Sequence, residues 1–102
     1  MAVLHGLGDS MEGYQWMPGQ MRLPWLNYLL INAPEPYFTG YSWFDIEGDR
    51  EPGIRRSRDL LFETLDEFRT QESVEADHLF VFGFSQGCVM TVETGFRYPH
   101  QL

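Results

Sequence analysis

The amino-acid sequence predicts an α/β fold in which short parallel strands alternate with helices. Three apolar stretches, at residues 2–4, 25–32 and 79–82, have the near-continuous hydrophobic character of strands buried in a parallel sheet. The third stretch passes directly into Gly-x-Ser-x-Gly at residues 83–87 and then into a helical pattern, which is the sequence of a sharp strand-to-helix turn. This alternation favours a parallel sheet of about three strands with flanking helices.

The size and composition of the chain indicate one folded domain. It has 102 residues, of which 43% are hydrophobic and 16% aromatic. The formal net charge of -8 disfavours nucleic acid and anionic membranes as main partners. Cys88 is the only cysteine, so an internal disulfide is impossible. Because we find neither a secretory signal nor an apolar run of the roughly 20 residues that span a bilayer, we expect a cytoplasmic location and no transmembrane segment.

The first strand, residues 2–4, runs straight into a glycine-rich loop. Its abrupt start predicts that an N-terminal piece is absent. In the loop, Gly6 and Gly8 let the main chain approach a ligand closely, and the Leu7 N–H is then a candidate donor to an oxyanion. The alternative is an ordinary turn between a strand and a helix. The pairing of this loop with the serine turn favours the first interpretation.

Asp9 and Glu12 have the spacing of a capping box, which predicts a short helix carrying Tyr14, Trp16 and Met17 and weakened by the Pro-Gly pair that follows. The second strand is expected over Trp25 to Asn32, because two prolines soon after it stop the pattern.

An unusual density of aromatic residues follows, over residues 37–45. A loop of this composition is expected to line a site. The alternative, at least as strong for most of these rings, is a small packed cluster beneath the loop. Asp45 lies in the same loop, but we assign it no catalytic role.

The next helix begins near Pro52 and ends near Gln71, with an apolar stripe that faces the sheet. This helix is expected to be scaffold. A polar connector leads from it to the third strand, which is predicted to be buried on both faces. A mostly buried helix follows that strand and ends at Pro99, since proline cannot continue it.

The turn at the end of the third strand carries the chemistry that we predict. Gly83 and Gly87 permit the strand and the helix to approach, which presents the Ser85 hydroxyl at a helix N-terminus. The Gln86 N–H there is the second candidate oxyanion donor. A bare Gly-x-Ser-x-Gly also occurs by chance, but the apolar run before it and the helical pattern after it oppose that alternative.

Three segments together resemble the α/β-hydrolase carboxylesterases and phospholipases that include acyl-protein thioesterases. They are Leu4-His5-Gly6-Leu7-Gly8-Asp9-Ser10, Ser42-Trp43-Phe44-Asp45 and Gly83-Phe84-Ser85-Gln86-Gly87. In order, they look like the oxyanion loop, the substrate-side loop and the nucleophile elbow of that family. The resemblance implies that Trp43 and Phe44 lie on the substrate side. The resemblance covers the whole chain but only about the first half of such an enzyme. It implies that residues 1–102 are the N-terminal part of a single α/β-hydrolase domain, with its first strand between the other two.

The departure from this family lies in the catalytic triad. These hydrolases place an acid and then a histidine after the nucleophile, but residues 86–102 hold no aspartate and only His100, at the far end of the last helix. His5 belongs to the loop motif, where a structural role is expected. The three histidines have no metal-ligand spacing, so we expect no metal and no cofactor.

Two functions remain from these observations. The first is a serine hydrolase that acts on a small acyl-ester substrate, such as an acyl ester, a lysophospholipid or an acyl thioester, through an acyl-enzyme on Ser85. The second is a non-catalytic remnant that binds acyl compounds or a partner chain. An unrelated α/β binding domain would require both glycine-rich loops to be coincidental. The apolar edges of a three-stranded sheet also predict self-association.

Overall fold

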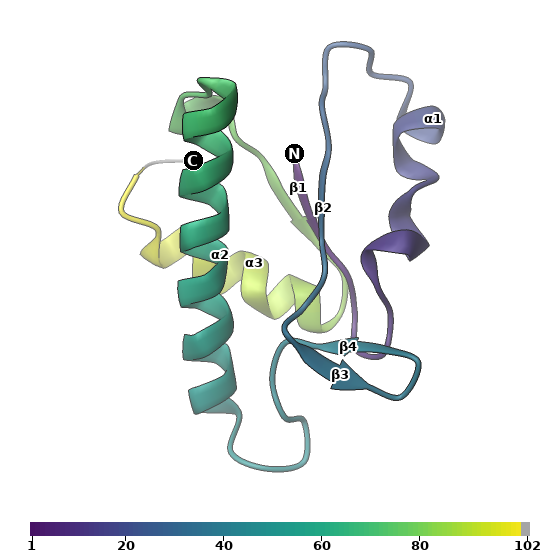
Figure 1. Cartoon of the computed structure of the whole chain (residues 1–102), viewed down its shortest axis with the longest axis vertical. Helices are drawn as coiled ribbons and strands as arrows, with labels where there is room; N and C mark the ends of the chain where they lie inside the picture. The colour runs from purple at the N-terminus through teal and green to yellow at the C-terminus, as the bar shows by residue number, and fades with distance from the viewer. Residues whose placement is uncertain (101–102) are drawn as a thin grey trace.

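The computed structural model describes residues 1–100 and shows an α/β fold with helices on both faces of a parallel sheet (Figure 1). In chain order the elements are β1 (Ala2–Leu4), the 3-10 helix η1 (Met11–Tyr14), α1 (Met17–Met21), β2 (Leu29–Ile31), β3 (Glu35–Tyr37), β4 (Gly40–Ser42), α2 (Arg50–Glu72), the 3-10 helix η2 (Ala76–His78), β5 (Val81–Gly83) and α3 (Gln86–Arg97). The predicted fold class is therefore confirmed.

The main sheet has three strands in the order β2-β1-β5, and both pairs are parallel. Leu4 lies opposite Ile31 of β2 on one side and Gly83 of β5 on the other. All three strands therefore end at the same edge of the sheet, where their following loops meet.

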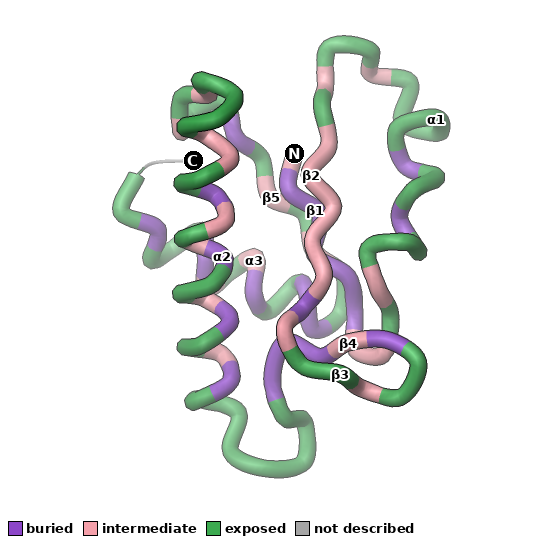
Figure 2. Tube along the Cα trace, viewed as in Figure 1, coloured by how far each residue is buried: buried purple, intermediate pink, exposed green. Residues whose placement is uncertain are grey.

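The side chains of β1 alternate between two cores. Val3 packs with Tyr14 and Met17 of the η1 and α1 side. Ala2 and Leu4 point to the opposite face, which α2 and α3 cover. β1 is fully buried because both of its faces and both of its edges are covered, as its purple colour shows (Figure 2).

The long helix α2 forms as predicted. The Asp49 side chain accepts a hydrogen bond from the Glu51 N–H at 3.2 Å and caps its N-terminus. Leu61 and Leu65 are each 1% exposed and lie in the two clusters on this face of the sheet. The helix ends at Ser73, which adopts the left-handed conformation with φ 54°.

The first helical segment differs from its prediction. The Asp9 carboxylate accepts from the Ser10 N–H, and no side chain caps η1, so the expected capping box is wrong. Pro18 does not weaken a continuous helix. It stands in the first turn of the separate helix α1. The backbone N–H that proline lacks would have no intrahelical partner at this position, so the helix loses no hydrogen bond.

The second strand is shorter than predicted, since only Leu29–Ile31 pair with β1. A parallel ladder cannot extend past its partner, and β1 offers three residues. Trp25, expected in this strand, is 64% exposed and contacts the ring of Phe80.

Part of the aromatic loop is a β-hairpin. β3 and β4 pair antiparallel, and Phe38 at the tip has φ 50° and is 90% exposed. The Gly8 N–H donates to the Tyr41 carbonyl and the Tyr41 N–H donates to the Asp9 carbonyl, both at 2.9 Å. The hairpin therefore holds the loop that follows β1.

The third strand and the last helix are much more exposed than predicted. Phe80 and Phe82 are 50% and 37% exposed, so this strand is not buried on both faces. Val92 and Phe96 of α3 are also exposed, and green stretches mark this helix in Figure 2. Within residues 1–100, β5 pairs only with β1, so its outer edge has no strand partner.

Within the described part of the chain, no helix combines the length and the apolar character needed to cross a membrane.

Candidate active site

Ser85 occupies the turn between β5 and α3 and has φ 57° and ψ -118°. A non-glycine residue rarely adopts positive φ, and this combination of angles is strained. The residue is exposed, and its N-cap position makes no side-chain capping bond. The expected strained turn is therefore present, with a serine hydroxyl held at a helix N-terminus.

Two glycines allow this turn to form. A Cβ atom on Gly83 would lie 2.1 Å from the Gly87 carbonyl oxygen, and a Cβ atom on Gly87 would lie 2.0 Å from the Leu4 carbonyl oxygen. Real Cβ atoms do not approach so closely. β5, α3 and β1 can therefore meet only because these two positions have no side chain.

The loop after β1 lies directly against the serine turn. A Cβ atom on Gly6 would be 3.2 Å from the Ser85 Cβ, which is tighter than ordinary contact. Gly8 has φ 78°, a conformation that favours glycine. Gly6 therefore allows the loop to approach Ser85, and Gly8 allows the chain to turn away after it.

The two backbone amides predicted to donate to an oxyanion are unoccupied. In residues 1–100, neither the Leu7 N–H nor the Gln86 N–H donates a hydrogen bond. Gln86 is the first residue of α3, where the helix leaves its N–H groups without intrahelical partners. An anion near these amides would also be favoured by the helix dipole.

Tyr14 packs against Val3 of β1, and its phenol is neutral. Burial raises the pKa of Tyr14 above its usual value of 10.0, and the nearby charge of Asp9 raises it further. The phenol therefore stays protonated at neutral pH and adds no negative charge beside the loop.

None of the three histidines is placed to act as a base for Ser85. His5 is fully buried, its Nε2 accepts from the Ala33 N–H at 3.0 Å, and its Nδ1 lies 2.7 Å from the Gly6 carbonyl oxygen. Both ring nitrogens are therefore engaged in holding the loop, as the expected structural role requires. His78 precedes β5, and His100 follows α3 at the end remote from Ser85.

The predicted substrate-side position of Trp43 and Phe44 needs correction. Trp43 is 0% and Phe44 4% exposed, and both lie in the core cluster with Leu4 and Met90. Their rings therefore have almost no surface to offer a substrate. The alternative of a packed cluster describes them better.

The side chain of Gln86 is a feature of the site that we did not predict. It is 4% exposed, and it accepts a hydrogen bond from the Trp43 N–H and donates one to the Phe44 carbonyl, both at 2.8 Å. A sequence signal for its burial exists, because Gln86, Met90 and Thr94 recur every four residues on one face of α3 and are all buried.

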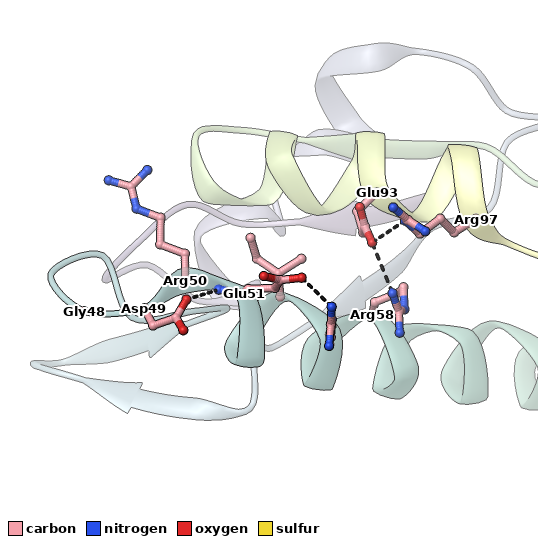
Figure 3. Close-up of a pocket in the computed structure, with 9 residues that line it drawn as sticks. Gly48, Asp49, Arg50, Glu51, Arg58, Glu93 and Arg97 are labelled. Atoms are coloured by element: carbon pink, nitrogen blue, oxygen red, sulfur yellow. Dashed lines mark hydrogen bonds and ion pairs between the residues drawn. The ribbon is translucent and has the colours of Figure 1, made fainter.

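A hollow with a volume of about 780 Å³ lies elsewhere, between the start of α2 and the second half of α3 (Figure 3). Its charges are mostly paired: Glu93 binds Arg58 at 3.3 Å and Arg97 at 2.8 Å. It contains none of the residues predicted for the active site. No group of three or more His, Cys, Asp or Glu side chains within residues 1–100 is arranged to hold a metal ion.

A parallel sheet whose edge strand ends in a strained serine at a helix N-terminus, beside a glycine-rich loop with a free amide, defines the serine-hydrolase class of α/β proteins. Comparison with known proteins agrees. The chain belongs to the phospholipase/carboxylesterase family, whose model matches residues 1–102.

Two curated relatives are acyl-protein thioesterases 1. The one from Schizosaccharomyces pombe is 30% identical over 112 residues, which cover 97% of this chain and 50% of the relative. The one from Candida albicans is 33% identical over 110 residues, with 89% and 47% covered. The chain thus spans about half the length of the curated relatives that it matches.

In comparison with solved structures, too, the chain covers about half of the larger protein. The crystal structure of esterase PE8 superimposes with a TM-score of 0.84 at 29% identity, covering 99% of this chain and 52% of that one. A carboxylesterase from Mesorhizobium loti, 18% identical, shares the fold with a TM-score of 0.82 over 96% of this chain and 48% of that one. The chain therefore matches about half of each of these solved structures.

Proposed function

We propose that this chain carries the nucleophile and the oxyanion donors of a serine hydrolase for carboxylic esters. Ser85 Oγ attacks the ester carbonyl carbon, the leaving alcohol or thiol departs, and the acyl-enzyme on Ser85 is then hydrolysed by water. The Leu7 and Gln86 amides stabilise the negative oxygen of the tetrahedral intermediate. The observation that carries the proposal is the strained conformation of Ser85 at the start of α3, with both amides unoccupied.

The substrates that fit the family are acyl esters, lysophospholipids and acyl thioesters. Two of the relatives are acyl-protein thioesterases, which supports the thioester as one of them. We further propose that residues 1–102 are the N-terminal part of a single α/β-hydrolase domain. The coverage of about half of each relative supports this.

The described residues supply no histidine base for Ser85. A serine hydroxyl is a weak nucleophile at neutral pH unless a base takes its proton. The base and the acid that orients it therefore come from a further segment or from a partner chain. Without them, the chain alone turns over esters very slowly.

The second candidate function rests on the same observation. A chain without a base for Ser85 can persist as a non-catalytic remnant that binds acyl compounds or a partner chain. The two functions differ in what happens when the missing half is supplied.

The experiment measures hydrolysis of a nitrophenyl ester by the chain alone and by the chain mixed with the C-terminal half of a related family member. Turnover that appears only in the mixture and disappears with Ser85→Ala is the expected result. A mixture that associates but stays inactive would favour the remnant. Fast turnover by the chain alone, abolished by Ser85→Ala, would show that a base is already present.

A further inference from the structure

We propose that the side chain of Gln86 is a positioning group, which fixes the direction of the oxyanion-donating N–H by tying the serine turn to residues 42–44. The proposal rests on the proposed function, because it concerns how one donor of that site is aimed. It assigns the Gln86 amide side chain a role separate from that of its backbone.

The hydrogen-bonding pattern around this side chain has one consistent orientation. The Oε1 atom accepts from the Trp43 N–H at 2.8 Å, and the Nε2 atom donates to the Phe44 carbonyl at 2.8 Å. Exchanging the two amide atoms would place a donor against the N–H and an acceptor against the carbonyl, so the alternative orientation loses both bonds.

Ser42 completes the pattern without competing for it. Its single hydroxyl hydrogen donates to the Phe44 carbonyl at 2.6 Å, which leaves none for Gln86 Oε1 at 3.4 Å. The Phe44 carbonyl thus accepts two bonds, one from Ser42 and one from Gln86. A carbonyl with both lone pairs used is held firmly in one direction.

Trp43, to which the Gln86 side chain is hydrogen-bonded, makes two further hydrogen bonds. The Trp43 indole N–H donates to the His5 carbonyl at 2.8 Å, and the Ser57 hydroxyl donates to the Trp43 carbonyl at 2.5 Å. The first bond joins it to the loop that carries Leu7, and the second joins it to α2. Trp43 and Ser57 are both fully buried.

These contacts link the two proposed donors through one rigid path. The Leu7 loop is bound to Trp43 through His5, and Trp43 is bound to the first residue of α3 through Gln86. Removing the Gln86 amide would leave β5 and α3 in place, because Gly83, Gly87 and Met90 hold their packing. The direction of the first N–H of α3 would then be free to vary.

A buried glutamine is otherwise an unfavourable choice at this position. An apolar side chain of the same size would fill the space without the cost of desolvating an amide. A polar side chain that reaches back over 42 and 43 residues is explained by the bonds it makes there.

The test measures how fast a fluorophosphonate modifies Ser85 in the full chain, over long incubation in mildly alkaline buffer. In this reaction the Ser85 Oγ–P bond forms, the P–F bond breaks, fluoride leaves and the serine proton goes to hydroxide. Because the adduct is permanent, even a slow reaction accumulates and can be followed by intact mass, with Ser85→Ala as the blank.

The variants are Gln86→Met, which keeps the size and removes both bonds, and Gln86→Asn, which keeps the amide but is too short to reach both partners. Gln71→Met, on the exposed face of α2, is the matched control. Melting temperature and circular dichroism report the folded fraction, so that rate constants are compared per folded molecule.

We expect the maximal rate constant to fall at least about tenfold in Gln86→Met, with the reagent concentration at half-saturation unchanged. Gln86→Asn should fall by a smaller factor, and Gln71→Met should match the wild type. Equal rate constants in wild type and in whichever Gln86 variant folds would overturn the positioning role while leaving the proposed function intact. A wild-type chain that stays unmodified at Ser85 even when it is mixed with the C-terminal half of a related family member would instead overturn the proposed function.

Discussion

At the scale of single residues, the strictest steric demand falls on Gly87. Any side chain there meets the Leu4 carbonyl at 2.0 Å, whereas Gly95, in the same helix, has nothing within 4 Å of its missing Cβ. We expect Gly87→Ala to destabilise the fold by about 3 kcal/mol or more. Gly95→Ala should stabilise it by about 0.5–1 kcal/mol. Urea unfolding of both variants measures the difference, and equal effects would contradict the close packing.

The strain at Ser85 can be measured by comparing two variants that both lose the hydroxyl. Glycine tolerates φ 57° and alanine does not, so we expect Ser85→Gly to be more stable than Ser85→Ala by about 1–2 kcal/mol. Thermal and urea unfolding give this difference directly. Two variants of the same stability would mean that the turn relaxes in solution.

The sequence predicted the strained turn at Ser85 and the close packing at its glycines, because glycine is the one residue that such close contacts allow. It did not predict the hydrogen bonds of the Gln86 side chain. Those partners, Trp43 and Phe44, are more than 40 residues away, and no local pattern encodes a contact of that kind.

At the scale of elements, α2 and α3 are joined by polar side chains as well as by their cores. Glu93 of α3 binds Arg58 of α2 and Arg97 of its own helix, and the Arg58 and Glu93 side chains are about four-fifths buried (Figure 3). We expect Glu93→Gln to lower the free energy of unfolding by about 1–2 kcal/mol, since, within residues 1–100, Arg58 then keeps only the exposed Asp59 as a charged partner. The exposed Glu63→Gln on α2 is the control and should change stability little. A Glu93 variant as stable as the control would contradict this account.

The far end of α3 is held to α2 through Tyr98. Its hydroxyl donates to Asp66 at 2.5 Å and accepts from Arg69 at 3.1 Å. Burial, followed by the bond to Asp66, raises the pKa of Tyr98 above its usual value of 10.0. The neutral phenol therefore contributes stability that is present below about pH 10 and is lost as the pH rises through the higher folded-state pKa.

The pH dependence of urea unfolding between about pH 8 and about pH 11 tests this contribution. Wild type should lose stability across the upper part of that range, and Tyr98→Phe should lose less. Part of the decline should remain in the variant, because the pKa of Tyr14 is raised as well. If the free energy of unfolding falls with pH equally in wild type and in Tyr98→Phe, ionisation of Tyr98 does not affect stability.

The element predictions failed where they depended on partners outside each element. An apolar run such as residues 79–82 indicates a buried strand, but whether both faces are covered depends on what packs against it. For the same reason, Val92 and Phe96 suggested a buried helix although they are exposed. Periodicity identified α2 correctly because its apolar stripe is long and Pro52 marks its first turn.

At the scale of the whole molecule, β5 and most of α3 belong to a long segment without charge. Residues 79–92 contain no charged side chain, in a chain whose net charge is -8. Phe80 just before β5, Phe82 of β5 and Phe96 of α3 are exposed. An unpaired strand edge with exposed apolar side chains is an aggregation site. We expect the isolated chain to self-associate at micromolar concentration.

Light scattering of wild type and of a Phe82→Thr, Phe96→Ser double variant tests this expectation. The variant should be markedly less associated. Phe38→Ser removes an even more exposed ring from the tip of the β3-β4 hairpin and should have little effect. A wild-type chain that is a monomer and unfolds cooperatively would contradict both the association and the proposal that the chain is part of a larger domain.

The order of the strands also affects how the protein is made on the ribosome. β1 lies at the centre of the sheet, yet it is synthesised roughly 80 residues before β5, with which it pairs. At about 5–20 residues per second, one edge of β1 waits roughly 4–16 s for its neighbour. During that time one edge of the central strand has no partner in the nascent chain, and this edge can pair with a strand of another chain.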